Sequence, residues 1–136
     1  MSNEDILPGF DDLSCDSLVI ALERVQELKT CLTMKLKGEI DTYSAPFFQR
    51  SAQKAIDAGF VHLVLVLDRV DYISSKAVGA LIQIQQSARD RGGDLVMARV
   101  HPRVMGVFKV LSLENFFQCA PSPAGALALM QDTGEN

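Results

Sequence analysis

The spacing of apolar and polar residues changes several times along the chain, and each change marks an expected element. From residue 32 to residue 37 apolar and polar side chains alternate strictly: Leu32, Met34 and Leu36 against Thr33, Lys35 and Lys37. A period of two predicts a strand with one face in the core and one in solvent. The apolar segment 18–25 fits a helical stripe as well as a strand. We favour a strand because a clean alternating strand follows it, with residues 26–30 as the hairpin loop.

The segment Val61–Leu67 is apolar except for His62 and has no polar face. Such a run predicts a central strand that helices cover on both sides. A short polar loop is expected from Asp68 onward, and the serine pair Ser74–Ser75 then opens an apolar helix that runs to about Arg91. A helix N-terminus presents free N–H groups and a positive dipole end, so it tolerates a phosphate well.

Helices and strands alternate through the rest of the chain. Ser44 is expected to cap a helix that carries Pro46 in its first turn and stops at Gly59. The remaining expected elements are a strand over 94–100, a helix from Pro102 with an apolar stripe of Val104, Val107, Phe108 and Leu111, a strand over 116–120 and a final helix that Ser122 caps. This order predicts an α/β fold with a mixed, mostly parallel sheet of about five strands and about four helices.

The length of 136 residues suits a single domain. We expect a flexible N-terminal arm over residues 1–16 with a small docked patch around Ile6, Leu7 and Phe10, a domain over 17–132 and a frayed C-terminus over 133–136. The net charge of −4 shows no overall excess of basic residues, so nucleic-acid binding is not expected. No apolar run approaches the length of a membrane span, and the acidic residues 1–12 do not have the pattern expected of a signal peptide. A cytoplasmic protein without membrane contact is therefore expected.

The cysteines and histidines predict neither a disulfide framework nor a metal site. Three cysteines, widely spaced and odd in number, lack the spacing of a zinc site. Cys31 and Cys119 fall in expected strands and are interpreted as buried free thiols. His62 is expected in a strand, and His101 in a loop that Pro102 holds extended. No metal and no cofactor is expected.

Three stretches of the chain, in this order and at this spacing, resemble the STAS family of anti-sigma factor antagonists over residues 18–131. The first is Leu36–Asp41, and the second is Leu65–Asp68 with Tyr72–Ser75 and Gly79. The third is Gly92–Leu95, followed by Pro102 before a helix that bears Val107, and later by Phe116, Phe117, Ala126 and Leu127.

The resemblance implies a single STAS-type domain that acts as a switch between protein partners. Its unphosphorylated form would bind an ATP-dependent serine kinase that also serves as an anti-sigma factor, and a metal-dependent serine phosphatase would reverse the phosphorylation. Counted back from Gly79, the matching phosphoacceptor is Ser75, with Ser74 as second choice. The implied partner-binding residues lie in the two loops and the following helix: Asp41, Thr42, Tyr72, Ile73, Ser74, Lys76 and Val78.

The chain departs from the family pattern beside the phosphoacceptor. Ser74 stands where an aspartate often precedes it, and Lys76 and Ala77 stand where a small residue and a glycine often follow. Lys76 could change which kinase recognises the loop, or it could pair with a phosphate at Ser75.

Each of these residues also has a purely structural interpretation. Ser75 could be only an N-cap that accepts from the N–H of Ala77 or Val78, with Ser74 as the alternative cap. Other structural readings are turn chemistry for Asp41, loop stabilisation for Asp68 and Asp71, a core position for Tyr72 and Ile73, and close packing on the sheet for Gly79.

Three classes of function follow from these alternatives. The first is a binding module whose affinity depends on phosphorylation of Ser75, and the second is a constitutive, unphosphorylated STAS scaffold in a larger signalling assembly. The third is a small enzyme or nucleotide binder, but the chain has no GxxxxGK[ST] or GxGxxG loop and no nucleophile near a base. We therefore expect no enzyme. The oligomeric state does not follow from the sequence.

Overall fold

The computed structural model describes residues 2–10 and 15–134, and it confirms the predicted α/β fold. The elements are α1 (Asn3–Ile6), β1 (Leu18–Arg24), β2 (Cys31–Ile40), α2 (Ser44–Asp57), β3 (His62–Ile73), α3 (Ser75–Asp90), β4 (Asp94–Ala98), α4 (Pro102–Val110), β5 (Gln118–Ala120) and α5 (Pro123–Gly134). The segment 18–24 is a strand, so the hairpin interpretation is confirmed.

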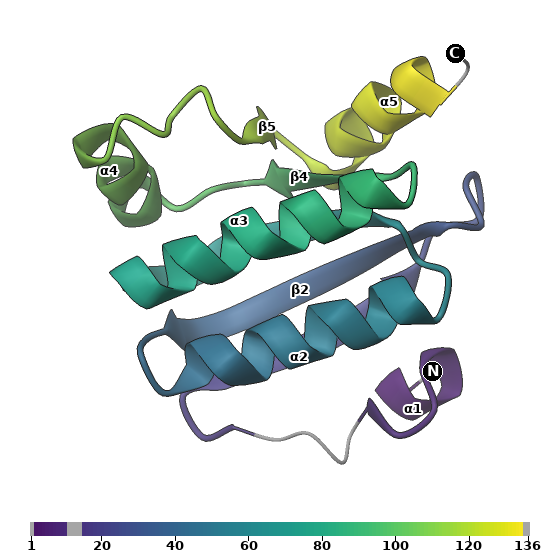
Figure 1. The fold of residues 1–136 in the computed structure, drawn as a ribbon, viewed down its shortest axis with the longest axis horizontal. Helices are drawn as coiled ribbons and strands as arrows, with labels where there is room; N and C mark the ends of the chain where they lie inside the picture. The colour runs from purple at the N-terminus through teal and green to yellow at the C-terminus, as the bar shows by residue number, and fades with distance from the viewer. Residues whose placement is uncertain (1, 11–14, 135–136) are drawn as a thin grey trace.

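The five strands form one sheet in the order β1-β2-β3-β4-β5. β1 pairs with β2 antiparallel, and every later neighbour is parallel. α2 and α3 lie side by side across one face of the sheet (Figure 1), and α5 packs on β3, β4 and β5. Two apolar clusters result, one beneath α2, α3 and α4 and a smaller one beneath α5.

β3 is buried on both faces, as its apolar run predicted. Leu63, Leu65 and Leu67 belong to the larger cluster, while Val64 and Val66 belong to the smaller one. Alternate side chains of a strand point to opposite faces, so one strand supplies both cores.

The loop expected after Asp68 is wrong, because β3 continues to Ile73. The extension pairs with β2 as far as Ile40, through two register shifts. Within it only Val70 and Ile73 are buried. The other four residues of the extension are exposed, and in the sequence alone such a polar segment resembles a loop. β4 is shorter than expected, because Arg99 has a φ of 53° and leaves the extended conformation.

The predicted patch around Ile6, Leu7 and Phe10 is docked, and all three side chains belong to the larger cluster. The amide of Asn3 ties α1 to β1: it donates to Ile20 O at 2.6 Å, and its oxygen accepts from Leu22 N at 2.8 Å. Residues 2–10 are thus packed on the domain instead of forming a loose arm. Residues 1 and 11–14 of the predicted arm, and 135–136 of the predicted frayed end, lie outside the described residues.

Candidate functional site

The predicted site residues gather where β2 and β3 end and α2 and α3 begin. Ile40 and Ile73 are paired at the ends of the two parallel strands, and the N–H of Ser74 donates to Ile40 O at 2.9 Å. Parallel strands bring their carboxyl ends to the same edge of a sheet. The two connections that follow them therefore lie next to each other, at the N-terminal ends of α2 and α3 (Figure 1).

Ser74, and not Ser75, is the N-cap of α3. Its backbone is extended, and its hydroxyl accepts from the N–H of Ala77 at 3.1 Å. Its side chain is only 8% exposed. Ser75 is the first helical residue and is exposed, and no hydrogen bond to its hydroxyl occurs among the described residues. The interpretation of Ser75 as a cap is therefore wrong, and the cap is its neighbour.

The first turn of α3 suits a negative charge. It contains no acidic residue, and Lys76 is exposed within it. The leading N–H groups of a helix have no intrahelical partner. The hydroxyl of Ser74 accepts from the N–H of Ala77 and its carbonyl oxygen from that of Val78, which leaves the N–H groups of Ser75 and Lys76 without a hydrogen bond among the described residues. A phosphate on Ser75 would thus meet free donors, the helix dipole and a nearby cation.

Asp41 organises the connection into α2. One of its carboxylate oxygens accepts from the N–H of Tyr43 at 2.9 Å and from the N–H of Ser44 at 2.8 Å. These bonds, chiefly the one from Ser44, lower the pKa of Asp41 because they favour the charged form. The turn interpretation of Asp41 is therefore confirmed, whatever else the residue does.

Ser44 does not cap α2 as predicted. The N-cap position is Tyr43, which makes no side-chain capping bond. The hydroxyl of Ser44 lies 2.7 Å from Glu39 O and accepts from the N–H of Asp41 at 2.9 Å. It is buried beneath the turn, so the side chain that satisfies the helix start comes from Asp41 instead.

The residues predicted to contact a partner divide into two groups. Thr42, Tyr72 and Lys76 are exposed, and Asp41 is partly so. Ile73 and Val78 are only 3% and 4% exposed and belong to the core, and the capping residue Ser74 of the predicted set is also buried. The burial of Ile73 and Val78 supports the core interpretation, and their predicted partner contact stays a prediction.

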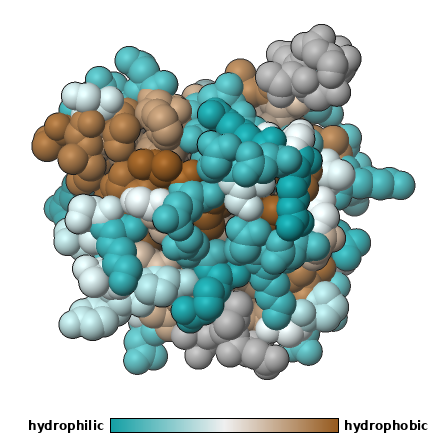
Figure 2. Space-filling model, in the orientation of Figure 1, coloured by the Kyte–Doolittle hydropathy of each residue, from teal (hydrophilic) through white to brown (hydrophobic). Residues whose placement is uncertain are grey.

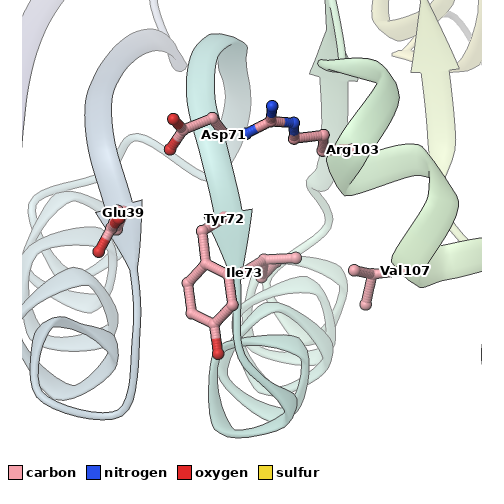
Figure 3. A pocket seen from close by; sticks show the side chains of 6 residues that line it. All are labelled: Glu39, Asp71, Tyr72, Ile73, Arg103 and Val107. Atoms are coloured by element: carbon pink, nitrogen blue, oxygen red, sulfur yellow. The ribbon is translucent and has the colours of Figure 1, made fainter.

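A hollow of about 330 Å³ lies beside this site, where β2, β3 and α4 meet (Figure 3). Its lining residues are Glu39, Asp71, Tyr72, Ile73, Arg103 and Val107. Arg103 extends from α4 toward β3 (Figure 3). Sequence reasoning missed Arg103, because only the packing of α4 brings it to this edge.

Exposed apolar side chains gather on and after α4, at the same end of the molecule. Figure 2 shows them as the brown patch at upper left, in the place that α4 occupies in Figure 1. Val110 is 84% exposed, and Leu111 and Phe116 are each 45% exposed. The predicted apolar stripe is correct for Val104 and Phe108, which are buried, but wrong for Leu111, which caps the helix in solvent.

Gly79 is not closely packed on the sheet, contrary to expectation. A Cβ added at this residue would meet no atom within 4 Å. Residues four apart share one face of a helix, so the partly buried Gly79 lies on the same face of α3 as the exposed Ser75. The glycine leaves α3 flat beside the candidate phosphoacceptor.

The cysteines and histidines lie apart from this edge. Cys31 is buried, and burial raises its pKa to about 11. Cys119 is partly buried with its pKa also raised by burial, and both thiols are free. His62 begins β3, and His101 is the extended residue before Pro102, as predicted. The described residues contain no cluster of three metal-binding side chains and no helix long and apolar enough to cross a membrane.

The resemblance implied a serine at the start of a helix that follows a strand. The structure has this order of elements, with Ser75 as the first residue of α3 after β3. The family model of the STAS domain matches residues 22–126. The chain belongs to the STAS domain family. The predicted resemblance to this family is thereby confirmed.

Relatives of this STAS domain are named as antagonists of anti-sigma factors. BtrV of Bordetella bronchiseptica, a candidate anti-sigma factor antagonist, is 29% identical over 93 residues, covering 68% of this chain and 80% of that protein. An anti-sigma factor antagonist of Mycobacterium paratuberculosis superposes with a TM-score of 0.74 at 19% identity, covering 88% of this chain and 98% of that one. Unphosphorylated SpoIIAA superposes with a TM-score of 0.70 at 18% identity, covering 84% and 97%. These structural likenesses show the shared fold.

Proposed function

We propose that this STAS domain is an anti-sigma factor antagonist whose partner affinity is set by phosphorylation of Ser75. The observation that carries the proposal is that two adjacent serines differ in burial and in hydrogen bonding. Ser74 is buried, and its hydroxyl caps α3 by accepting from the N–H of Ala77. Ser75 is the first helical residue and is exposed. A kinase can reach Ser75 without disturbing the cap.

The partner-binding surface consists of the exposed members of the predicted set. Asp41 and Thr42 follow β2, Tyr72 lies near the end of the neighbouring strand β3, and Ser75 and Lys76 begin α3. The partner we propose is an anti-sigma factor that is also an ATP-dependent serine kinase, with a serine phosphatase as the opposing enzyme in the cytoplasm. SpoIIAA, which shares the fold, has also been solved in a phosphorylated form.

A phosphate at Ser75 would change the interface more than it changes the domain. It adds about 1.5 to 2 negative charges. The start of α3 accommodates them through its dipole and Lys76. A partner packed on the same surface must desolvate that charge. A loss of about 3 kcal/mol of binding free energy already weakens a complex more than about a hundredfold.

The first test is the intact mass of the protein isolated from its native cells, with site mapping and a phosphatase-treated control. We expect one phosphatase-sensitive phosphate at Ser75. In parallel, lysate and ATP should phosphorylate wild type and Ser74→Ala but not Ser75→Ala. Unmodified protein across growth and stress conditions would overturn the proposal, as would a phosphate that maps to Ser74.

A constitutive scaffold is the second candidate, and the apolar surface of Val110, Leu111 and Phe116 favours it. Burying these side chains against a partner would not involve Ser75. Partner capture that is equally strong for wild type and Ser75→Asp would support the scaffold, while capture lost only in Ser75→Asp would support the switch.

A further inference from the structure

The sheet face opposite α2 and α3 is only partly covered. α5 packs on β3, β4 and β5. At the other side of the same face Val19 is 62% exposed, and Ala21, Lys35 and Lys37 are exposed beside it. This face looks away from the viewer in Figure 1, behind the sheet that carries α2 and α3.

A hollow of about 530 Å³ on this face concentrates cationic side chains. Four of them line it, namely Lys35, Lys37, Arg69 and Arg99, together with the carboxylates of Glu23 and Asp68. Lys35 is paired with Glu23 at 2.8 Å. In the part of the chain that the structure describes, Lys37, Arg69 and Arg99 make no ion pair. The whole chain has a net charge of −4, so this surplus of positive charge is local to the face.

Arg99 lines this hollow, and its backbone has an unfavourable conformation. Its φ of 53° lies in the left-handed region, which non-glycine residues rarely adopt. The N–H of Arg99 donates to Ala120 O at 3.1 Å, which fixes the turn at the end of β4. Strained residues of this kind persist where surrounding structure holds them, often at functional sites.

The hollow continues into a longer trough. A second hollow of about 380 Å³ shares Glu23, Thr33 and Pro123 with the first and runs along the edge of α5. The cations follow the strands, and two residues on the same face of a strand, such as Lys35 and Lys37, are about 7 Å apart. Carboxylates two residues apart in an extended peptide have the same spacing.

We propose that this partly covered sheet face docks an extended acidic segment of a partner protein. Lys37, Arg69 and Arg99 bind its carboxylates, and arginine can do so with two parallel hydrogen bonds. Val19, the register partner of Lys37, adds an apolar contact between the charges. Because the face lies across the sheet from α2 and α3, this contact and the proposed switch at Ser75 use different surfaces, and either can hold without the other.

The test is a titration of the ¹⁵N-labelled protein with a synthetic peptide of alternating glutamate and serine, against a lysine–serine peptide as control. We expect the glutamate peptide alone to shift the amide signals of β1, β2 and Arg99. Binding should weaken as salt rises, since exposed charges are screened. The double variant Lys37→Glu/Arg69→Glu should lose at least about tenfold in affinity, the equivalent of about 1.4 kcal/mol.

The matched control is Arg50→Glu/Lys109→Glu, which makes the same charge change at exposed residues of α2 and α4. This variant should retain most of the affinity. Equal losses in both double variants, or shifts spread over the whole surface, would overturn the proposal. Binding to vesicles of anionic lipid through the same residues, without binding to the glutamate peptide, would overturn it in favour of a membrane surface.

Discussion

The hydroxyl of Ser74 accepts a hydrogen bond from the N–H of Ala77 at 3.1 Å, and this contact closes the first turn of α3. The next residue, Ser75, is exposed, and its hydroxyl makes no capping hydrogen bond among the described residues. Two chemically identical neighbours therefore differ in what their removal would cost.

Replacing Ser74 by alanine should lower the free energy of unfolding by about 1 kcal/mol, because a capping acceptor is lost. Ser75→Ala should change it by less than about 0.5 kcal/mol, as expected for an exposed site without contacts. Urea denaturation followed by circular dichroism measures both. Equal effects of the two variants would contradict the assignment of Ser74 as the cap.

Ser75→Asp should raise the free energy of unfolding by about 0.3 to 1 kcal/mol at low salt, because a negative charge is favourable at a helix N-terminus. α3 has no acidic residue in its first turn to compete with it. The matched control is Ser87→Asp in the last turn of the same helix, where the dipole effect has the opposite sign. The difference between the variants should shrink in high salt; a salt-independent difference would speak against a dipole effect.

Asp41→Asn should destabilise the protein at neutral pH, because a charged acceptor of the N–H groups of Tyr43 and Ser44 becomes neutral. The folded pKa of Asp41 is lowered from 3.8, so its stabilising effect is complete above that value and disappears as the pH falls through the folded pKa. Urea midpoints of wild type and variant should therefore converge in acid. Curves that stay parallel at every pH would show that the carboxylate charge is unimportant.

Gly79→Ala should stabilise the protein by up to about 1 kcal/mol, since alanine favours a helix interior and the new methyl group meets nothing within 4 Å. Gly93→Ala is the contrasting variant, because its Cβ would lie 1.8 Å from Val61 O. Thermal denaturation should move in opposite directions for the two. If Gly79→Ala weakens partner capture while raising stability, the flat surface beside Ser75 is part of the interface.

Cys31 should resist alkylation by iodoacetamide in the folded protein at about pH 8, because burial raises its pKa to about 11 and only the thiolate reacts. Labelling after unfolding in denaturant serves as the control, and peptide mapping by mass spectrometry locates the label. Rapid labelling of Cys31 in the native protein would contradict its buried position beneath α5.

Local periodicity was enough to predict most of the fold. The alternation over β2 and the apolar run of β3 each identify a strand, because burial of one or both faces selects the residues directly. The polar end of β3 could not be predicted in this way. Of its residues from Asp68 to Ile73 only Val70 and Ile73 are buried, and solvent accepts the polar side chains of the others while the backbone still pairs with β2.

The sequence by itself determined the order of the elements, the family pattern and the place of the serine pair between a strand and a helix. Only the tertiary structure decided which serine caps α3, because the parallel pairing of β3 with β2 holds Ser74 extended through its bond to Ile40. The same is true of Arg103 beside the site and Arg99 on the opposite sheet face. Their positions depend on how distant segments pack, and no local spacing along the chain encodes that.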